Sequence, residues 1–385
     1  MLLIVLFILI FSTVSYLRPL PAIKPSGTIS PPPVSQVVEL PWPSYGQGAI
    51  AAQGYGTLQS HGEAKPVPIA SVAKVITALA VLKQKPLSGG QSGPTITIAA
   101  EDVAIYNDYY TKGGSVVKVE AGEQLSERQA LEALLIPSAN NMADTLSRWA
   151  FGSQASYLDY ANKMVKDMGL TNTAVADASG FSPKTLSTAN DLALLGLAAL
   201  DNSTIKEVVA KQSAELPVAG SVSSTNWLLD SDGVIGIKTG NTNEAGGCFL
   251  FAAKRTIQGL EVTLAGALTS APDLNTAIKD ARVIINASDN GFQKVSIITK
   301  QQPAADYAAP WGVHSQAFAS SDVNVLNWRG QPVEVNVAAD EVQAPAKAGA
   351  AVGKIQIKAG QKTTNAPLVL RSDLPKPPFW WRIFH

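Results

Sequence analysis

Residues 71–82 read SVAKVITALAVL, and this stretch predicts an amphipathic helix that begins at a serine. Apolar residues recur at helical spacing along one face, namely Val72, Val75, Ile76 and Leu79. Because Ser71 and Lys74 are three positions apart, a helix brings the hydroxyl and the amine to the same face. We expect Lys74 to be partly buried, which disfavours its charged form and lowers its pKa, as a basic catalyst requires.

Two other S-x-x-K tetrads test how specific this pattern is. Ser115 and Lys118 follow two glycines in a stretch that reads as a strand, where positions three apart point to opposite faces. Ser203 and Lys206 lie on a polar helix, where we expect Lys206 to be a solvated charge. For Ser71 itself the alternative is a plain N-cap role. A helix start also leaves free backbone N–H groups that can face a developing oxyanion.

A second motif, Ser138-Ala139-Asn140, follows Pro137 at a predicted break between two helices. A loop in that place can point polar groups into a cleft, where Ser138 could relay a proton and Asn140 could hold a substrate amide. The alternative is that both residues cap the following helix. A similar triplet at residues 288–290, Ser-Asp-Asn, lies in a turn-like stretch and is predicted to be an ordinary loop.

A third motif, Lys238-Thr239-Gly240, ends a strand-like apolar run over residues 233–237. Lys238 and Thr239 offer an ammonium and a hydroxyl to a substrate carboxylate, and Gly240 lets a ligand approach the backbone closely. Together the three motifs supply a nucleophilic hydroxyl, two amines, a second hydroxyl and an amide. That set is enough for acyl transfer without a Ser-His-Asp triad.

Composition excludes several other kinds of chemistry. The chain has three histidines, His61, His314 and His385, and one cysteine, Cys248, so a histidine-based hydrolase or a His-rich zinc site is hard to build. We expect no metal and no cofactor. Thirty basic and 30 acidic residues give zero net charge, which gives no support for nucleic-acid binding.

The two ends of the chain carry signals of export and membrane contact. Residues 1–17, MLLIVLFILIFSTVSYL, hold no charge and have a length between a signal-peptide core and a membrane span, so they predict a signal peptide or a membrane anchor. Residues 18–44 are rich in proline and predict a linker. The tail over residues 376–385 is aromatic and basic and is expected either at a membrane interface or docked on the protein.

Between these ends the patterns predict two domains. Over residues 45–290 helices occupy the middle and strands both ends, which favours an α/β domain whose sheet pairs a hairpin near 49–59 with strands near 233–239, 246–254 and 260–268. Over residues 291–375 short alternating strands with Gly and Pro turns predict a small all-β domain.

The chain resembles the serine-type D-alanyl-D-alanine carboxypeptidases, which are low-molecular-weight penicillin-binding proteins, over about residues 46–287. Beyond the three motifs the resemblance rests on residues 134–141, 169–173, 177–180, 187–191, 236–240 and 244–248. It implies a β-lactamase/transpeptidase-like α/β fold, an antiparallel sheet with flanking helices and a helical subdomain. Residues 349–370 more loosely resemble the β-rich C-terminal domain of many members.

The resemblance also implies catalytic roles. Ser71 would be the nucleophile that forms an acyl-enzyme, and Lys74 would take its proton. Ser138 and Lys238 would pass a proton to the leaving D-alanine. The implied substrate is a peptidoglycan stem peptide ending in D-Ala-D-Ala, and β-lactam antibiotics should acylate the same serine.

Further positions would bind the substrate. Asn140 would position the peptide, and Lys238 with Thr239 would bind its terminal carboxylate beside Gly240. The N–H groups of Ser71 and Asn241 would form an oxyanion hole. Two departures stand out: many members have His or Tyr where this chain has Asn241, and the middle of the second motif is alanine.

Three alternatives share many of these groups. A D,D-endopeptidase acting on cross-linked peptidoglycan would use all of them, and a non-catalytic penicillin- or wall-binding module would retain them. A β-lactamase of the kind that uses a glutamate is disfavoured, because no glutamate follows Ser138 until Glu207. The expected location is outside the cytoplasm, attached to the membrane through the N-terminal segment; the membrane-interface alternative for the C-terminal tail would add a second contact.

Overall fold

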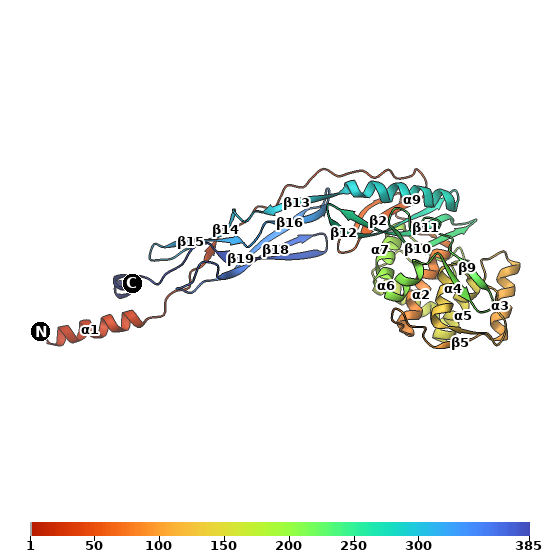
Figure 1. Ribbon diagram of the computed structural model, residues 1–385, viewed down its shortest axis with the longest axis horizontal. Coiled ribbons are helices and arrows are strands. Elements are labelled where there is room, and N and C mark those ends of the chain that lie inside the picture. The colour runs from red at the N-terminus through yellow and green to blue at the C-terminus, as the bar shows by residue number, and fades with distance from the viewer. Residues whose placement is uncertain (1) are drawn as a thin grey trace. The chain divides into compact units, whose positions relative to one another are not determined.

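The computed structural model describes residues 2–385 and divides the chain into two compact units (Figure 1). One unit is Glu39–Asn290, and the other joins the segment up to Val38 with Gly291–His385. Met1, the first residue of the predicted signal or anchor segment, lies outside the described residues.

A five-stranded antiparallel sheet organises the Glu39–Asn290 unit, in the order β10-β11-β12-β2-β3. Its strands are β2 (Gln47–Ala52), β3 (Gly56–His61), β10 (Val234–Thr242), β11 (Gly246–Ile257) and β12 (Leu260–Ala271). The prediction that the first hairpin pairs with the last strands is confirmed. Gln258 and Gly259 turn the chain between β11 and β12 with φ of 50° and 80°. Such angles suit a tight hairpin turn.

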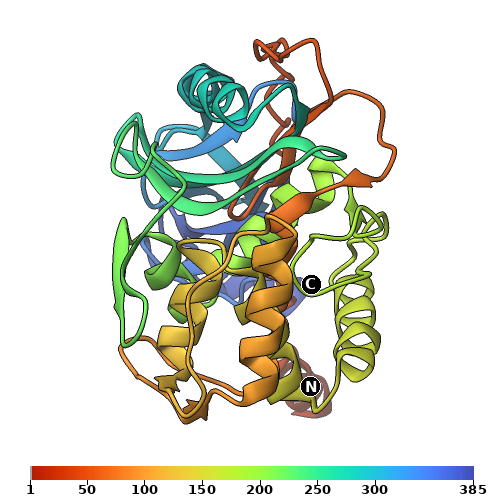
Figure 2. The ribbon, with the colours of Figure 1, turned by 90° about the vertical axis from the view of Figure 1, so that its right-hand side faces the viewer.

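Helices cover both faces of this sheet (Figure 2). Helix α9 (Leu274–Ser288) packs on β11 and β12, and α7 (Ala189–Leu200) packs on β12 and β2 from the other side. Gly196 allows α7 its close approach, because a Cβ there would lie 3.0–3.1 Å from the side chains of Leu250, Ala265 and Ile237.

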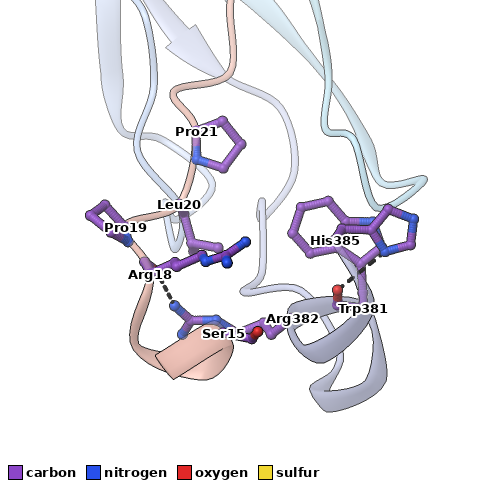
Figure 3. A pocket seen from close by; sticks show the side chains of 8 residues that line it. All are labelled: Ser15, Arg18, Pro19, Leu20, Pro21, Trp381, Arg382 and His385. Atoms are coloured by element: carbon purple, nitrogen blue, oxygen red, sulfur yellow. Dashed lines mark hydrogen bonds between the residues drawn. The ribbon is translucent and has the colours of Figure 1, made fainter. Parts of the chain in front are cut away.

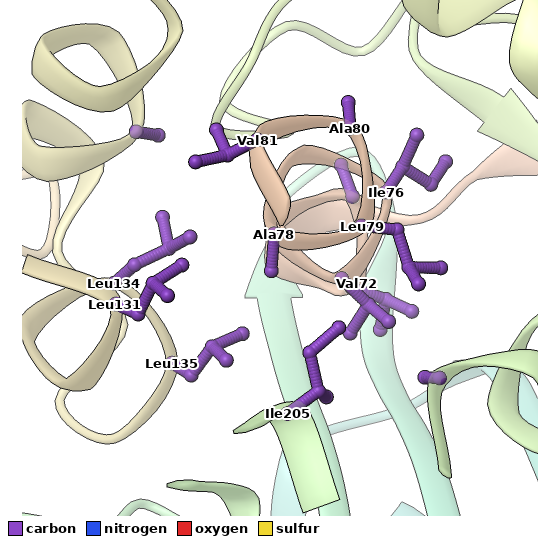
Figure 4. Close-up of a cluster of buried hydrophobic side chains, with 14 of the residues drawn as sticks. Val72, Ile76, Ala78, Leu79, Ala80, Val81, Leu131, Leu134, Leu135 and Ile205 are labelled. Atoms are coloured by element: carbon purple, nitrogen blue, oxygen red, sulfur yellow. The ribbon is translucent and has the colours of Figure 1, made fainter. Parts of the chain in front are cut away.

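Helix α2 (Ala73–Gln84) lies at the centre of the helical region, directly after the short 3-10 turn η1 (Ala70–Val72). All ten residues from Ala73 to Leu82 are buried, so the helix is covered on every side rather than along one apolar face as its sequence predicts. Leucines of α4 (Glu127–Leu135) and Ile205 of α8 (Ser203–Val209) pack around it (Figure 4). Lys74 therefore lies inside the core.

The remaining elements of this unit surround the same core. They are the helices α3 (Ala100–Thr111), α5 (Asn140–Phe151) and α6 (Gln154–Asp167), and the strand pairs β4 (Val67–Pro68) with β7 (Leu186–Ser187), β5 (Thr95–Thr97) with β6 (Gln124–Ser126), and β8 (Ser213–Leu216) with β9 (Gly220–Ser223). Ser126 and Gln129 form a capping box at the start of α4. Helix α8 ends at Val209, and the chain then enters the β8–β9 hairpin.

The prediction of a strand around Ser115–Lys118 is wrong. Residues 115–119 are irregular, because the side-chain amide of Asn141 takes the place of a neighbouring strand. Val117 N donates to Asn141 Oδ1 at 3.1 Å, and Asn141 Nδ2 donates to Val117 O at 2.9 Å. Lys118 is exposed and pairs with Glu120, so this tetrad brings no amine to its serine.

The second unit is built on a six-stranded sheet and a separate strand pair. The sheet order is β1-β14-β15-β19-β18-β17, and β13 pairs with β16. The strands are β1 (Pro25–Ser26), β13 (Phe292–Ile298), β14 (Pro303–Ala308), β15 (His314–Ala319), β16 (Val323–Trp328), β17 (Val333–Ala339), β18 (Ala351–Ala359) and β19 (Lys362–Leu370). Part of the predicted linker thus forms a strand of this sheet.

Two helices, α1 (Leu2–Leu17) and α10 (Phe379–Phe384), complete this unit. Among residues 2–385, no helix is both long and apolar enough to cross a membrane.

Candidate active site

Ser71 lies in the 3-10 turn that leads into α2, and its hydroxyl is available for chemistry. Neither η1 nor α2 has a side-chain N-cap, so the N-cap alternative for Ser71 is wrong. Ala70, directly before it, has φ of +45°, a left-handed conformation that costs energy in a residue with a Cβ. Ser71 is partly exposed, whereas Lys74 is fully buried beneath it.

The amine of Lys74 is held by three oxygens. Lys74 Nζ lies 2.8 Å from Ser71 Oγ, 2.7 Å from Asn140 Oδ1 and 2.9 Å from the backbone oxygen of Ser179. The amide and backbone oxygens only accept hydrogen bonds, so they take the two N–H groups of a neutral amine. The nitrogen lone pair then faces the Ser71 hydroxyl, which is the geometry of a base.

Electrostatics favour that neutral form. Burial, followed by the nearby Lys238 ammonium, holds the pKa of Lys74 well below its usual value, and the carboxylates of Asp177 and Asp144 oppose this shift. Burial also lowers the pKa of Lys238 to about 7. Two buried amines close to one another therefore disfavour carrying charge at the same time.

The second motif supplies Ser138 from the loop between α4 and α5, and Asn140 from the first position of α5. The N-cap of α5 is Ala139 and makes no side-chain bond, so the alternative that Ser138 and Asn140 cap this helix is wrong. Ser138 has φ of +69°, is buried, and its Oγ has no hydrogen-bond partner among residues 2–385. A buried hydroxyl without a partner can still bond to a ligand or a water molecule.

The third motif lies on β10, beside η1. A Cβ at Gly240 would lie 3.0 Å from Ser71 N, so only a hydrogen side chain keeps that backbone N–H approachable. Lys238 is buried, with Nζ donating to Thr239 O at 3.1 Å, and Thr239 Oγ1 lies 2.5 Å from Thr225 Oγ1. The hydroxyl at position 71 and the amines at 74 and 238 thus occupy one region of the unit.

Asn241 directly follows the third motif, whereas the residues of the other S-x-x-K and S-x-N patterns lie elsewhere in the unit. Asn241 comes next on β10, is exposed, and pairs in register with Gly247 of β11. Lys206 is exposed on α8, as predicted. Ser288 ends α9 and donates its hydroxyl to the helix backbone, and Asp289 pairs with Arg255.

Several polar residues behind Lys74 escaped the sequence analysis. The hydroxyl of Tyr109, on α3, donates to Asp144 Oδ2 at 3.1 Å and lies 3.3 Å from Ser179 Oγ. Ser179 Oγ also donates to Asp177 Oδ2 at 2.8 Å. Burial raises the pKa of Asp144 to about 6. This network fixes the loop whose backbone oxygen holds Lys74.

Little in the sequence could have identified these residues as part of the site. Asp177 and Ser179 lie in one of the segments that carry the family resemblance, but Tyr109 lies on a helix that the sequence analysis did not predict. Thr225, the partner of Thr239, belongs to no motif. The Tyr109–Asp144 and Lys74–Ser179 contacts join residues that are 35 and 105 positions apart along the chain.

A partly exposed serine bonded to a buried lysine, next to the edge strand of an antiparallel sheet, is the arrangement of a serine–lysine acyl-transfer enzyme. The sequence model of the D-alanyl-D-alanine carboxypeptidase family, peptidase family S11, matches residues 51–267, which is more than half of the chain. The chain belongs to this family.

Similar proteins agree with this assignment. The chain is 25% identical over 357 residues to D-alanyl-D-alanine carboxypeptidase DacC of Escherichia coli, covering 88% of this chain and 84% of that one. It is 22% identical over 326 residues to DacF of Bacillus subtilis, covering 80% of each chain. A Pseudomonas aeruginosa D-alanyl-D-alanine endopeptidase is 28% identical over 232 residues, covering 57% of this chain and 71% of that one.

Solved structures confirm the predicted fold class. The carboxypeptidase DacD of Francisella tularensis superposes with a TM-score of 0.60 at 18% identity, covering 89% of this chain and 95% of that one. The Streptomyces K15 DD-transpeptidase superposes with a TM-score of 0.56 at 26% identity, covering 67% of this chain and 98% of that one.

Proposed function

We propose that this protein is a serine-type D-alanyl-D-alanine carboxypeptidase that removes the terminal D-alanine from peptidoglycan stem peptides. One observation carries the proposal beyond family membership: the buried Lys74 amine lies 2.8 Å from the Ser71 hydroxyl, with two other acceptors for its N–H groups. That geometry equips the serine as a nucleophile at neutral pH without any histidine.

In the first step, Ser71 Oγ attacks the carbonyl carbon of the penultimate D-alanine and its proton passes to Lys74 Nζ. The C–N bond then breaks, and the proton held by Lys74 passes to the leaving D-alanine amine through Ser138 and Lys238, which leaves Lys74 neutral again. In the second step, water attacks the acyl-enzyme ester, which releases the shortened peptide and restores the Ser71 hydroxyl. A β-lactam stops after the first step, because its ring-opened product stays attached to Ser71.

Binding roles follow from the same residues. Lys238 and Thr239 would meet the terminal carboxylate, while Asn140 would bond to the substrate amide through its side-chain NH2 group. The backbone N–H groups of Ser71 and Asn241 would stabilise the oxyanion. The absence of a side chain at Gly240 supports this arrangement, since a Cβ there would crowd the Ser71 N–H.

The substrate places the enzyme outside the cytoplasm, in the periplasm or the cell-wall space. We also propose that it stays at the membrane through α1 and α10. Helix α1 carries no charged side chain, and α10 exposes Phe379, Trp380 and Phe384. Aromatic and basic residues of this kind favour the membrane interface.

Two substrates test the reaction directly. The purified protein is incubated with a pentapeptide ending in D-Ala-D-Ala and, separately, with a cross-linked peptide dimer, and products are separated by mass. We expect D-alanine release from the pentapeptide, loss of that release in Ser71→Ala, and normal release in the matched control Ser203→Ala, which alters the exposed S-x-x-K tetrad.

Other outcomes assign the alternatives. Cleavage of the dimer without D-alanine release would show that the protein is a D,D-endopeptidase, the activity for which the similar Pseudomonas protein is named. If neither substrate is turned over but fluorescent penicillin still labels the protein, the chain is a binding module and the carboxypeptidase proposal fails.

A further inference from the structure

The N-terminal helix α1 and the C-terminal helix α10 meet within one unit, although they lie at opposite ends of the sequence. Strand β1 pairs with β14, and the buried Ile23 bridges to Val342, so the segment after α1 is tied to the β unit. Arg382 Nη2 donates to Arg18 O at 2.7 Å, and the Arg382 guanidinium lies 4.7 Å from the Tyr16 ring centre.

A pocket opens at this junction (Figure 3). Figure 3 shows Ser15, Arg18 and Arg382 on one side of it and Trp381 with His385 on the other. No acidic side chain lines the pocket. Two guanidinium groups and an imidazole therefore face a common space whose lining side chains carry no compensating negative charge.

A buried polar group points to a ligand in this pocket. Ser15 is 3% exposed, and its Oγ has no hydrogen-bond partner among residues 2–385. Buried hydroxyls in proteins are normally hydrogen-bonded, so this one lacks an acceptor. An oxyanion would provide that acceptor and also pair with the arginines, whose forked donors match phosphate oxygens.

The surface around the pocket favours a lipid. Helix α1 is apolar and exposed nearly throughout, and Trp380 and Phe384 of α10 are 68% and 71% exposed. A helix that is apolar on every side is stable only where apolar material covers it. At 16 residues α1 is about 24 Å long, and the hydrocarbon core of a bilayer is ~30 Å thick, so most of the helix can lie in apolar surroundings.

We propose that Ser15, Arg18, Arg382 and His385 bind the phosphate of an anionic phospholipid headgroup, so that α1 and α10 attach the protein to the membrane as one unit. The apolar helix then lies among the acyl chains, and the aromatic side chains of α10 lie at the interface beside the bound phosphate. This phosphate site exists only while α1 is retained, because cleavage near Ser15 would remove one side of the pocket.

Vesicle flotation of the full chain tests this site. Vesicles of phosphatidylcholine alone are compared with vesicles that also contain phosphatidylglycerol, and intact mass records whether α1 is present. Arg382→Gln is compared with Lys376→Gln, which removes an equal charge nearby but does not line the pocket. A basic residue that acts only through the general surface field changes affinity by about fivefold.

We expect tighter binding to the phosphatidylglycerol vesicles, a loss of at least about tenfold in Arg382→Gln, and a loss of no more than about fivefold in Lys376→Gln. Ser15→Ala should also weaken binding, although it changes no charge. Matching urea unfolding of the variants establishes that they are folded.

Three results would overturn the proposal. Equal losses in Arg382→Gln and Lys376→Gln would show general electrostatic attraction without a site. Inorganic phosphate that binds by calorimetry but fails to compete with vesicle binding would assign the pocket to free phosphate. An intact mass showing cleavage close to Ser15 in the membrane-bound protein would exclude any role for α1.

Discussion

Replacing Lys74 with alanine should nearly abolish acylation of Ser71. The amine lies 2.8 Å from Ser71 Oγ and is the only amine bonded to it among the described residues. General-base catalysis contributes about 10²–10⁴ in rate. That corresponds to ~3–5.5 kcal/mol in activation free energy, since each tenfold step is worth about 1.4 kcal/mol. Lys74→Arg should lose as much, because a guanidinium does not deprotonate in proteins.

The assay is stopped-flow fluorescence with a labelled penicillin, which gives the second-order rate constant of acylation. Lys206→Ala is the matched control, because Lys206 has the same spacing from a serine but is exposed on α8. Lys74→Ala also leaves Asn140 Oδ1 and Ser179 O without their partner. Each unpaired buried acceptor costs about 1–3 kcal/mol, so unfolding must be followed in parallel.

A folded Lys74→Ala variant that is acylated within a few fold of the wild-type rate would refute this reasoning. Lys74 would then be a structural residue, and the base would have to be sought elsewhere. A comparable loss in Lys206→Ala would show that the assay responds to a lost surface charge rather than to the base.

Three further changes probe charge and space at the site. The folded state raises the pKa of Asp144 from 3.8 to about 6, which means that folding favours the protonated carboxyl. Its contribution to the stability of the folded protein is therefore fully present below about pH 4 and is lost as the pH rises through about 6. The free energy of unfolding of Asp144→Asn, measured with urea, should therefore exceed that of the wild type by up to ~3 kcal/mol at pH 8 and be similar to it at pH 4. The same difference at both pH values would contradict this. The folded state lowers the pKa of Lys238 from 10.5 to about 7. The wild type should therefore gain stability relative to Lys238→Gln as the pH rises from about 7 to 10. Stability curves of the two proteins that stay parallel over this pH range would show that Lys238 does not titrate in this way. Gly240→Ala places a Cβ 3.0 Å from Ser71 N and should slow penicillin acylation by about 10²-fold, the effect of losing one oxyanion donor, whereas an unchanged acylation rate would remove that N–H from the mechanism.

The sheet and the three motifs were accessible from sequence because their signals are local. Alternating apolar residues and turn chemistry marked the hairpin and the last strands, which the sheet indeed brings together. Ser71 and Lys74 are close because helical geometry alone makes them so.

The rest depends on contacts between distant segments. The complete burial of α2 comes from α4 and α8 packing around it, and no pattern within residues 71–82 records those neighbours. Tyr109 reaches the site because α3 lies against α5, a contact that bridges 35 positions. The pairing of β1 with β14 joins Pro25 to Tyr307, which a proline-rich composition conceals.

The identity of the acylated residue tests the central claim most directly. The protein is reacted with penicillin, digested, and the modified peptide is fragmented in a mass spectrometer. We predict one penicilloyl ester on Ser71, absent from Ser71→Ala. An adduct on Ser138, Ser203 or any other residue, with Ser71 unmodified, would contradict the account.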